Sequence, residues 1–197
     1  MDVLIFLGSP RKKGNSEILT QAVIEGVEQA GGRSEIIRLC DLKISGCLNC
    51  GGCDKAGKCV VEDDMTPLYD KIIATDKIIL ASPIFFYGIT AQAKAFIDRC
   101  QALWNRKRLL QEKGEWEDNP ERQGLFISVA ATSGAKIFVG AVLTMKYGFD
   151  AMGINYAGDI LVTGPDRRGD MKRYDRKLDE AAEAGRNFIL GRDAHVD

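Results

Sequence analysis

Short apolar runs alternate with longer segments of helical periodicity along this chain. The runs predict strands at residues 3–7, 34–39, 77–81, 125–131 and 154–162. The first run, Val-Leu-Ile-Phe-Leu, contains no polar position, which is typical of a strand buried on both faces of a parallel sheet. The periodic segments predict helices at residues 16–30, 64–74, 90–104, 137–152 and 171–190.

This alternation predicts an α/β fold, a doubly wound five-stranded parallel sheet with helices on both faces. Ligands bind such sheets outside the carboxyl ends of the strands. The loops at 8–16, 82–89 and 131–136 follow the first, third and fourth strands, so we expect them to form the binding site.

Residues that commonly cap helices or interrupt strands predict where these elements begin and end. Asn15 or Ser16 is placed to cap the first helix, and Ser82-Pro83 is expected to end the third strand. The chain is predicted to form a single domain over residues 1–197. Two segments lie outside the regular pattern: a cysteine-rich loop at 46–63 and a charged stretch at 105–123, interpreted as an excursion.

Charge and composition exclude some classes of function. The net charge is −1 and the pI is near 6.0, so no overall basic field favours nucleic acid. The first apolar run lasts five residues and has no basic segment before it, which is too short for a signal peptide or a membrane span. We therefore expect a cytoplasmic protein with no membrane or nucleic-acid partner, whose cysteines are metal-bound or free.

Histidine chemistry is not expected. The one histidine, His195, lies in the tail, where we expect it to be inert, so no histidine general base is expected in the core. This argues against hydrolysis by a Ser-His-Asp triad. No side chain is predicted to be catalytic.

The loop after the first strand reads Ser-Pro-Arg-Lys-Lys-Gly-Asn-Ser and leads into a helix N-terminus. Free backbone N–H groups and the helix dipole make that position an anion site. Arg11 could bind a phosphate group bidentately, and Gly14 would let the backbone approach it. Ser9, Asn15 and Ser16 could donate to its oxygens. The alternatives are an ordinary solvated turn and a weak nucleic-acid contact.

The loop after the third strand carries three consecutive aromatic residues, Phe85, Phe86 and Tyr87. Loops at a binding edge normally avoid large apolar groups unless they bury them or bind ligands with them. A flat conjugated ring could lie along this wall; core packing by Phe85 and Phe86 is the alternative. The small residues Ala131-Thr132-Ser133-Gly134 follow the fourth strand and could hold the polar edge of a ring.

Four of the six cysteines, Cys47, Cys50, Cys53 and Cys59, fall within 13 residues at x2, x2 and x5 spacing. Thiolates at x2 spacing, with a fourth close by, are typical of iron–sulfur ligation. Structural zinc sites more often use two separated knuckles or mixed Cys/His ligands. The three possibilities are a cluster, zinc, and free thiols or a disulfide. Cys40 and Cys100 are expected to be small core residues.

Three segments together resemble the flavodoxin-like NAD(P)H-dependent FMN reductases. They are Ser-Pro-Arg-x-x-Gly-Asn-Ser at 9–16, Ser-Pro-Ile-Phe-Phe-Tyr-Gly at 82–88 and Ala-Gln-Ala-Lys-Ala-Phe-Ile-Asp-Arg at 91–99. The cysteine loop resembles that of the iron–sulfur flavoprotein branch of this family. The resemblance covers roughly residues 2–165.

The resemblance implies a flavodoxin-like fold with FMN in the crevice at the strand ends. It places the FMN phosphate on Ser9, Arg11, Gly14, Asn15 and Ser16. It places the isoalloxazine ring along Pro83, Ile84, Phe85, Phe86, Tyr87 and Gly88, completed by Ala131, Thr132, Ser133 and Gly134. It implies a 4Fe-4S cluster on Cys47, Cys50, Cys53 and Cys59.

The resemblance also implies a function and partners. It implies a homodimer or homotetramer, in which the cluster faces the flavin of a neighbouring subunit, and a ferredoxin-like carrier or NAD(P)H as electron partner. We therefore predict an FMN-dependent oxidoreductase that passes electrons between FMN and the cluster. The alternatives are a cluster-free NAD(P)H-dependent FMN or quinone reductase and a non-enzymatic flavin-binding redox sensor.

Overall fold

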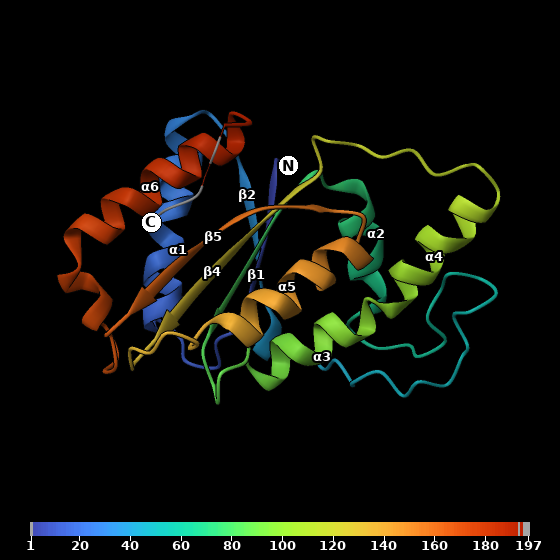
Figure 1. Ribbon diagram of the computed structural model, residues 1–197, viewed down its shortest axis with the longest axis horizontal. Helices are drawn as coiled ribbons and strands as arrows, with labels where there is room; N and C mark the ends of the chain where they lie inside the picture. The colour runs from blue at the N-terminus through green and yellow to red at the C-terminus, as the bar shows by residue number, and fades with distance from the viewer. Residues whose placement is uncertain (1, 193, 195–197) are drawn as a thin grey trace.

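Five parallel strands form the centre of the computed structural model, which describes residues 2–192 and 194 (Figure 1). The sheet has the order β2-β1-β3-β4-β5, and every neighbouring pair is parallel. This order is the flavodoxin-like one, so the predicted fold class is confirmed. The strands are β1 Val3–Leu7, β2 Ser34–Arg38, β3 Lys77–Pro83, β4 Gln123–Ala130 and β5 Asn155–Thr163.

Helices cover both faces of this sheet, because successive side chains of each strand point to opposite sides. Val3, Ile5 and Leu7 of β1 are buried against α1, Asn15–Gln29, and α6, Asp175–Ile189. Leu4 and Phe6 are buried on the opposite face. That face packs against α2, Thr66–Ala74, α3, Ala91–Arg99, and α5, Val139–Ala151. The continuous apolar runs in the sequence follow from this two-sided burial.

The predicted excursion at 105–123 is wrong in its first half. Residues expected as one helix and an excursion form two helices, α3 and α4, Gln101–Glu112, that meet at Cys100. The backbone N–H groups of Leu103 and Trp104 both bond to the Cys100 carbonyl, so the new helix starts within one residue. The buried side of α4 comprises Ala102, Leu103 and Asn105. This buried stripe is short, and charged residues follow it. The sequence of α4 therefore shows little of the apolar periodicity that predicts a helix.

The expected break of β3 at Ser82-Pro83 is also wrong. Ser82 pairs with Ser128 and Pro83 with Val129, so β3 includes both residues and ends at Pro83. Proline is tolerated there because a strand end needs no further ladder donor. The Ile84 N–H then bonds to the Val129 carbonyl at 3.0 Å and directs the loop onward.

Two helix starts differ from expectation. Gly14 is the N-cap of α1 and has an extended backbone, so Asn15 and Ser16 lie inside the first turn rather than capping it. The last helix begins at Asp175 rather than Met171, because a short 3-10 turn, η2 Asp170–Arg173, precedes it.

Two cysteines, Cys40 and Cys100, lie outside the cysteine-rich loop. Cys100 is fully buried, as predicted, and burial raises the pKa of its thiol. Cys40 lies half-buried in a 3-10 turn, η1 Leu39–Asp41, and its Sγ donates to the Gly8 carbonyl at 3.7 Å. His195 falls outside the described residues. Within 2–192 and 194, no helix combines the length and the apolar character needed to span a membrane.

Candidate functional site

A cavity of about 210 Å³ lies at the carboxyl edge of the sheet, where the loops after β1, β3, β4 and β5 meet. Most of the residues predicted to bind a cofactor line this cavity. They are Ser9, Arg11, Gly14, Asn15, Ser16, Pro83, Ile84, Phe85 and Ala131. The fold therefore brings together three loops that the sequence places about 70 and 120 residues apart, as expected for parallel strands.

The cavity is built on the N-terminus of α1. Among the described residues, no side chain caps this helix, so the N–H groups of its first turn remain available to an anion. Ser9 is buried, and its Oγ accepts from the Arg11 N–H at 3.2 Å, which fixes the turn before the helix. A Cβ on Gly14 would lie 2.9 Å from the Arg11 carbonyl oxygen, so only glycine lets this turn close. This geometry suits a phosphate group.

Asn15 differs from its predicted role. Its Oδ1 accepts from the N–H groups of Gly169 and Met171 at 3.1 and 3.2 Å. Its Nδ2 donates to the Arg167 carbonyl at 3.0 Å. The side chain therefore fastens the loop after β5, although Asn15 also lines the cavity.

The loop after β5 was not anticipated as part of the site. Pro165 and Asp166 line the cavity, together with Pro10 and Val129. Arg11 Nη1 donates to the Asp166 carbonyl at 3.4 Å, so the two loops touch. Strand order alone could have indicated this loop, because it leaves the carboxyl end of the fifth strand, where ligands bind such sheets.

The three aromatic residues after β3 form an exposed turn. Phe85 and Gly88 exchange backbone hydrogen bonds of 2.9 and 3.0 Å, while Phe86 and Tyr87 have φ values of +49° and +63°. Phe86 is fully exposed, and Phe85 and Tyr87 are more than half exposed, so the core-packing alternative is wrong. A left-handed backbone conformation is energetically unfavourable for bulky residues. Residues that keep such a conformation cluster at functional sites.

Part of the predicted ring site lies outside the cavity. The lining includes Phe85 but not Phe86, Tyr87 or Gly88, and Ala131 but not Thr132 or Ser133. Gly134 lines a neighbouring hollow against α5 instead. The six predicted residues that lie outside this lining remain predictions as cofactor contacts. The aromatic turn itself rests on α5, because a Cβ on Gly140 would lie 2.8 Å from the Tyr87 carbonyl oxygen.

A second cavity, of about 150 Å³, is lined by all four clustered cysteines. Cys47 and Cys50 are exposed, and Cys53 and Cys59 are half-buried. In the part of the chain that the structure describes, no three cysteine, histidine or acidic side chains are close enough to hold one metal ion. The four cysteines therefore share one cavity.

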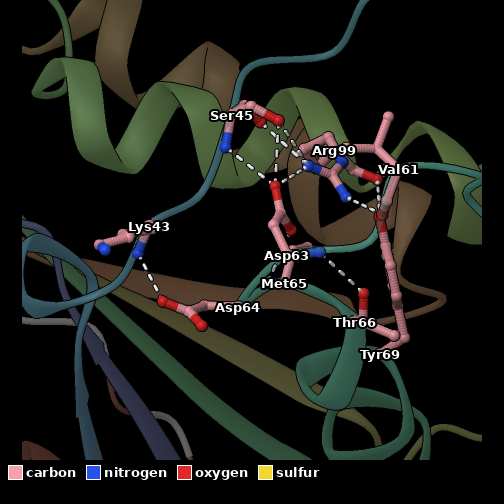
Figure 2. Close-up of polar contacts among 9 residues, drawn as sticks. All are labelled: Lys43, Ser45, Val61, Asp63, Asp64, Met65, Thr66, Tyr69 and Arg99. Carbon is pink, nitrogen blue, oxygen red and sulfur yellow. Dashed lines mark hydrogen bonds and ion pairs between the residues drawn. The ribbon is translucent and has the colours of Figure 1, made fainter.

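A buried ion pair closes the base of the cysteine loop (Figure 2). Arg99 Nη1 donates to Asp63 Oδ2 at 2.6 Å and to the Ser45 carbonyl at 3.1 Å, and Nη2 donates to the Val61 carbonyl at 2.9 Å. Arg99, at the end of α3, therefore holds both ends of the loop. Asp63 is thus paired with Arg99, the largest fully buried side chain among the described residues.

The protonation of this ion pair follows from its surroundings. Burial raises the pKa of the Asp63 carboxyl, but hydrogen bonds from Arg99, Ser45 and Met65 outweigh burial and hold the pKa at about 2. Burial lowers the pKa of the Arg99 guanidinium, but Asp63 and Tyr69 reverse that effect and raise it. Both groups are therefore charged at neutral pH.

Arg99 also lines the cysteine cavity. Its Nε is buried without a hydrogen-bond partner among the described residues. Cys59 is near enough to Arg99 to contribute to the raised pKa of the guanidinium. A buried cation with a spare donor suits a ligand set of negative charge, such as thiolates around a metal centre.

Helix α4 forms the other support of the loop. Asn105 Nδ2 donates to Cys53 Sγ and to Asp54 Oδ1, both at 3.1 Å. Arg108 Nη2 donates to the Asp54 carbonyl at 2.9 Å. A Cβ on Gly57 would lie 2.7 Å from Arg106 Cα, so the loop backbone lies directly on the helix. The segment interpreted as an excursion therefore holds the cysteine loop.

The two cavities share no lining residue. The strand-end cavity is built on α1 and on the loops after β1, β3, β4 and β5. The cysteine cavity is built on the loop before α2 and on the α3–α4 junction, and Figure 1 shows this loop beside α4. The chain therefore has two separate candidate sites.

Comparison with known proteins gives a family match. The family described as NADPH-dependent FMN reductase matches residues 1–154. The chain is 38% identical over 114 residues to an iron-sulfur flavoprotein of Archaeoglobus fulgidus, covering 58% of this chain and 52% of that protein. It is 36% identical over 103 residues to an iron-sulfur flavoprotein of Methanocaldococcus jannaschii, covering 52% and 53%. The chain thus spans about half the length of the curated relatives it matches.

Solved structures share the same architecture. An NAD(P)H:quinone oxidoreductase from Methanothermobacter marburgensis has a TM-score of 0.65 and 19% identity, over 95% of this chain and 98% of that one. This likeness shows the fold. The family match and the relatives confirm the resemblance predicted from the sequence.

Proposed function

Since the chain belongs to the NADPH-dependent FMN reductase family, we propose that it is an FMN-dependent oxidoreductase whose cysteine loop carries a 4Fe-4S cluster. The observation that carries this proposal is the presence of two built cavities in one chain. One has a helix N-terminus suited to phosphate, and the other is lined by four cysteines. Electrons would pass between the two groups.

The strand-end cavity supports the FMN assignment residue by residue. Ser9, Arg11 and the uncapped N-terminus of α1 would hold the phosphate group. Pro83, Ile84 and Phe85 would line one side of the ring, and the exposed aromatic turn would cover it. Asp166 lies in the same cavity and could accept hydrogen bonds from ribityl hydroxyls.

The cysteine pattern supports a cluster over a single zinc ion. Three of the four cysteines are at x2 spacing with the fourth close by, which is typical of iron–sulfur ligation. Structural zinc sites more often use two separated knuckles or mixed Cys/His ligands. All four cysteines line one cavity. The names of the two relatives also support the cluster.

When bound, FMN supplies paired-electron or single-electron chemistry and a cluster supplies single electrons. The chain's own residues would position these groups. The N–H groups of α1 and Arg11 would neutralise the phosphate, and Arg99 would offset the negative charge of the thiolates. No described side chain in either cavity needs to act as an acid or a base in this proposal.

Anaerobic purification tests the proposal. One FMN with roughly four irons and four acid-labile sulfides per chain, and a broad visible shoulder lost on reduction, is the expected result. One zinc, or no metal, would contradict the cluster; rapid turnover with NADPH would then favour a cluster-free FMN or quinone reductase. Tight flavin without turnover by any of several donors would favour a redox sensor. Absence of flavin would overturn the proposal altogether.

We further propose a homodimer or homotetramer that uses NAD(P)H or a ferredoxin-like carrier as electron partner. Val139, Leu143 and Tyr147 lie four residues apart on α5 and are all more than half exposed. Tyr147 shares a hollow with Trp104 of α4. A contiguous apolar stripe of this kind supports association of copies. Light scattering of the purified protein tests it, and a monomer at micromolar concentration would contradict it.

A further inference from the structure

Asn105 is a buried amide whose surroundings are unusual for a helix interior. It lies on the first turn and a half of α4 and is 2% exposed. Its Nδ2 is 3.1 Å from Cys53 Sγ and 3.1 Å from Asp54 Oδ1. A thiol sulfur is a weak acceptor, and a hydrogen bond to it becomes stronger when the sulfur carries negative charge.

The orientation of this amide is determined by its second partner. A carboxylate oxygen can only accept, so the nitrogen end of the Asn105 amide must face Asp54. The same nitrogen bonds to Cys53, which places an N–H group, and not the carbonyl oxygen, toward the sulfur. The sulfur is thereby offered a donor, as a thiolate ligand requires.

Two further contacts fix the position of the cysteine loop on α4, next to Asn105. Arg108, one turn further along α4, donates to the Asp54 carbonyl. Gly57 approaches the backbone of α4 at Arg106, where a side chain on Gly57 would collide. The helix therefore contacts the loop at Cys53, Asp54 and Gly57, which fixes where the Cys53 sulfur lies relative to the cavity.

We propose that Asn105 is a positioning residue for the cysteine-bound cluster: its amide fixes Cys53 Sγ toward the cavity and, by donating to that sulfur, makes the cluster easier to reduce. This inference rests on the proposed function. Hydrogen bonds to the ligand sulfurs and burial are among the factors that set the potential of such a cluster. Asn105 supplies the donor, and it is itself buried.

Two readouts test the proposal, one without metal and one with it. Asn105→Leu removes the donor at similar size, and Asn105→Asp replaces it with an acceptor. Gln111→Ala is the matched control, because Gln111 is an exposed amide on α4 that lines neither cavity. FMN binding, at a cavity that includes none of these residues, reports whether each variant is folded.

In the metal-free protein, hydrogen exchange over residues 47–60 should be faster in Asn105→Leu and Asn105→Asp and unchanged in Gln111→Ala. In the cluster-loaded protein, Asn105→Leu should lower the midpoint potential by the equivalent of roughly tenfold in the electron-transfer equilibrium, about 59 mV for one electron. Asn105→Asp should lower it further or reduce the iron content.

The outcomes separate this proposal from the proposed function. Unchanged exchange in Asn105→Leu overturns the positioning role, whether or not iron binds. An unchanged potential at full iron content, or an equal shift in Gln111→Ala, overturns the tuning role. If wild-type protein takes up no iron, the cluster assignment fails and the tuning role fails with it, while hydrogen exchange still decides whether Asn105 positions the loop.

Discussion

Arg99 Nη1 lies 2.6 Å from Asp63 Oδ2, and this ion pair joins the end of α3 to the end of the cysteine loop. The side chain of Arg99 is 1% exposed and that of Asp63 is 14% exposed. The pair is therefore shielded from water, and its loss has larger consequences than the loss of a surface pair.

Removing one partner of this pair should destabilise the protein strongly. Arg99→Leu or Asp63→Leu leaves a buried charge unpaired, at a cost of about 3–5 kcal/mol in the free energy of unfolding. The double variant should cost less than the sum of the two, since no unpaired charge remains. Denaturant unfolding measures both. Lys94→Ala, which removes the exposed Lys94–Asp98 pair on the same helix, is the control and should change stability by less than about 0.5 kcal/mol. Additive single and double variants would contradict the pairing.

Stability should fall in acid because of Asp63. The pKa of its carboxyl is lowered from 3.8 to about 2 in the folded protein. A lowered pKa means that the stabilisation is complete above the unfolded-state value and is lost as the pH falls through the folded-state value. Between pH 5 and pH 2, wild type should therefore lose about 2 kcal/mol more than Asp63→Asn, which has no proton to bind. Unfolding curves at each pH measure the difference, in which the other carboxylates cancel. Parallel losses in the two proteins would show that Asp63 titrates normally.

The phosphate assignment predicts the effect of Arg11. Arg11→Ala should weaken FMN binding by about 1.5–3 kcal/mol, or roughly 10- to 150-fold in Kd, because a charge-assisted hydrogen bond is lost. Fluorescence titration with FMN measures this. Lys12→Ala is the matched control, since Lys12 has the same charge and does not belong to the cavity lining. Equal losses in both variants would indicate a general electrostatic effect rather than a phosphate contact.

Asn15 should act through the loop after β5. Asn15→Ala removes three hydrogen bonds and should cost about 1–3 kcal/mol of stability. The N–H groups of Gly169 and Met171 should then exchange with solvent faster, as NMR would show. Asn15→Asp keeps the acceptor for both and should preserve their protection. If Asn15→Ala weakens FMN binding while leaving both amides protected, the side chain binds the ligand directly, as the sequence suggested.

Gly57 should be intolerant of a side chain. Its φ is +62° and a Cβ would lie 2.7 Å from Arg106 Cα, so Gly57→Ala should push the loop off α4 and cost about 1 kcal/mol or more. Metal content should fall and hydrogen exchange over 50–60 should rise, with FMN affinity unchanged. Gly46→Ala, in the same loop, has open space around its Cβ position and should have little effect. Full metal content in Gly57→Ala would show that docking on α4 is dispensable.

Elements with strong local patterns were predictable from the sequence. The unbroken run Val3–Leu7 is β1, and the stripe from Leu19 to Val27 is the buried face of α1. The break at Cys100 had no such signal, because no glycine or proline marks it. The helix after it was missed because α4 buries only a few residues, one of which is polar.

The candidate sites divide in the same way. Loop positions follow from strand order, so Ser9, Arg11 and Pro83 could be placed together in advance. Contacts between distant side chains could not, because they depend on packing that no local period encodes. Arg99 and Asp63 are 36 residues apart, and Asn105 and Cys53 are 52 apart. The direction of the Asn15 side chain likewise depends on a loop more than 150 residues away.

The absence of shared lining between the two cavities has an evolutionary consequence. Substitutions that erode the cysteine loop need not disturb the residues around the strand-end cavity, and the reverse also holds. A lineage could therefore lose or regain the cysteine loop while the residues of the strand-end cavity stay under unbroken selection. In such a lineage, we expect Arg99, Asn105 and Gly57 to drift together with the four cysteines, whereas Ser9, Arg11 and Gly14 would stay fixed.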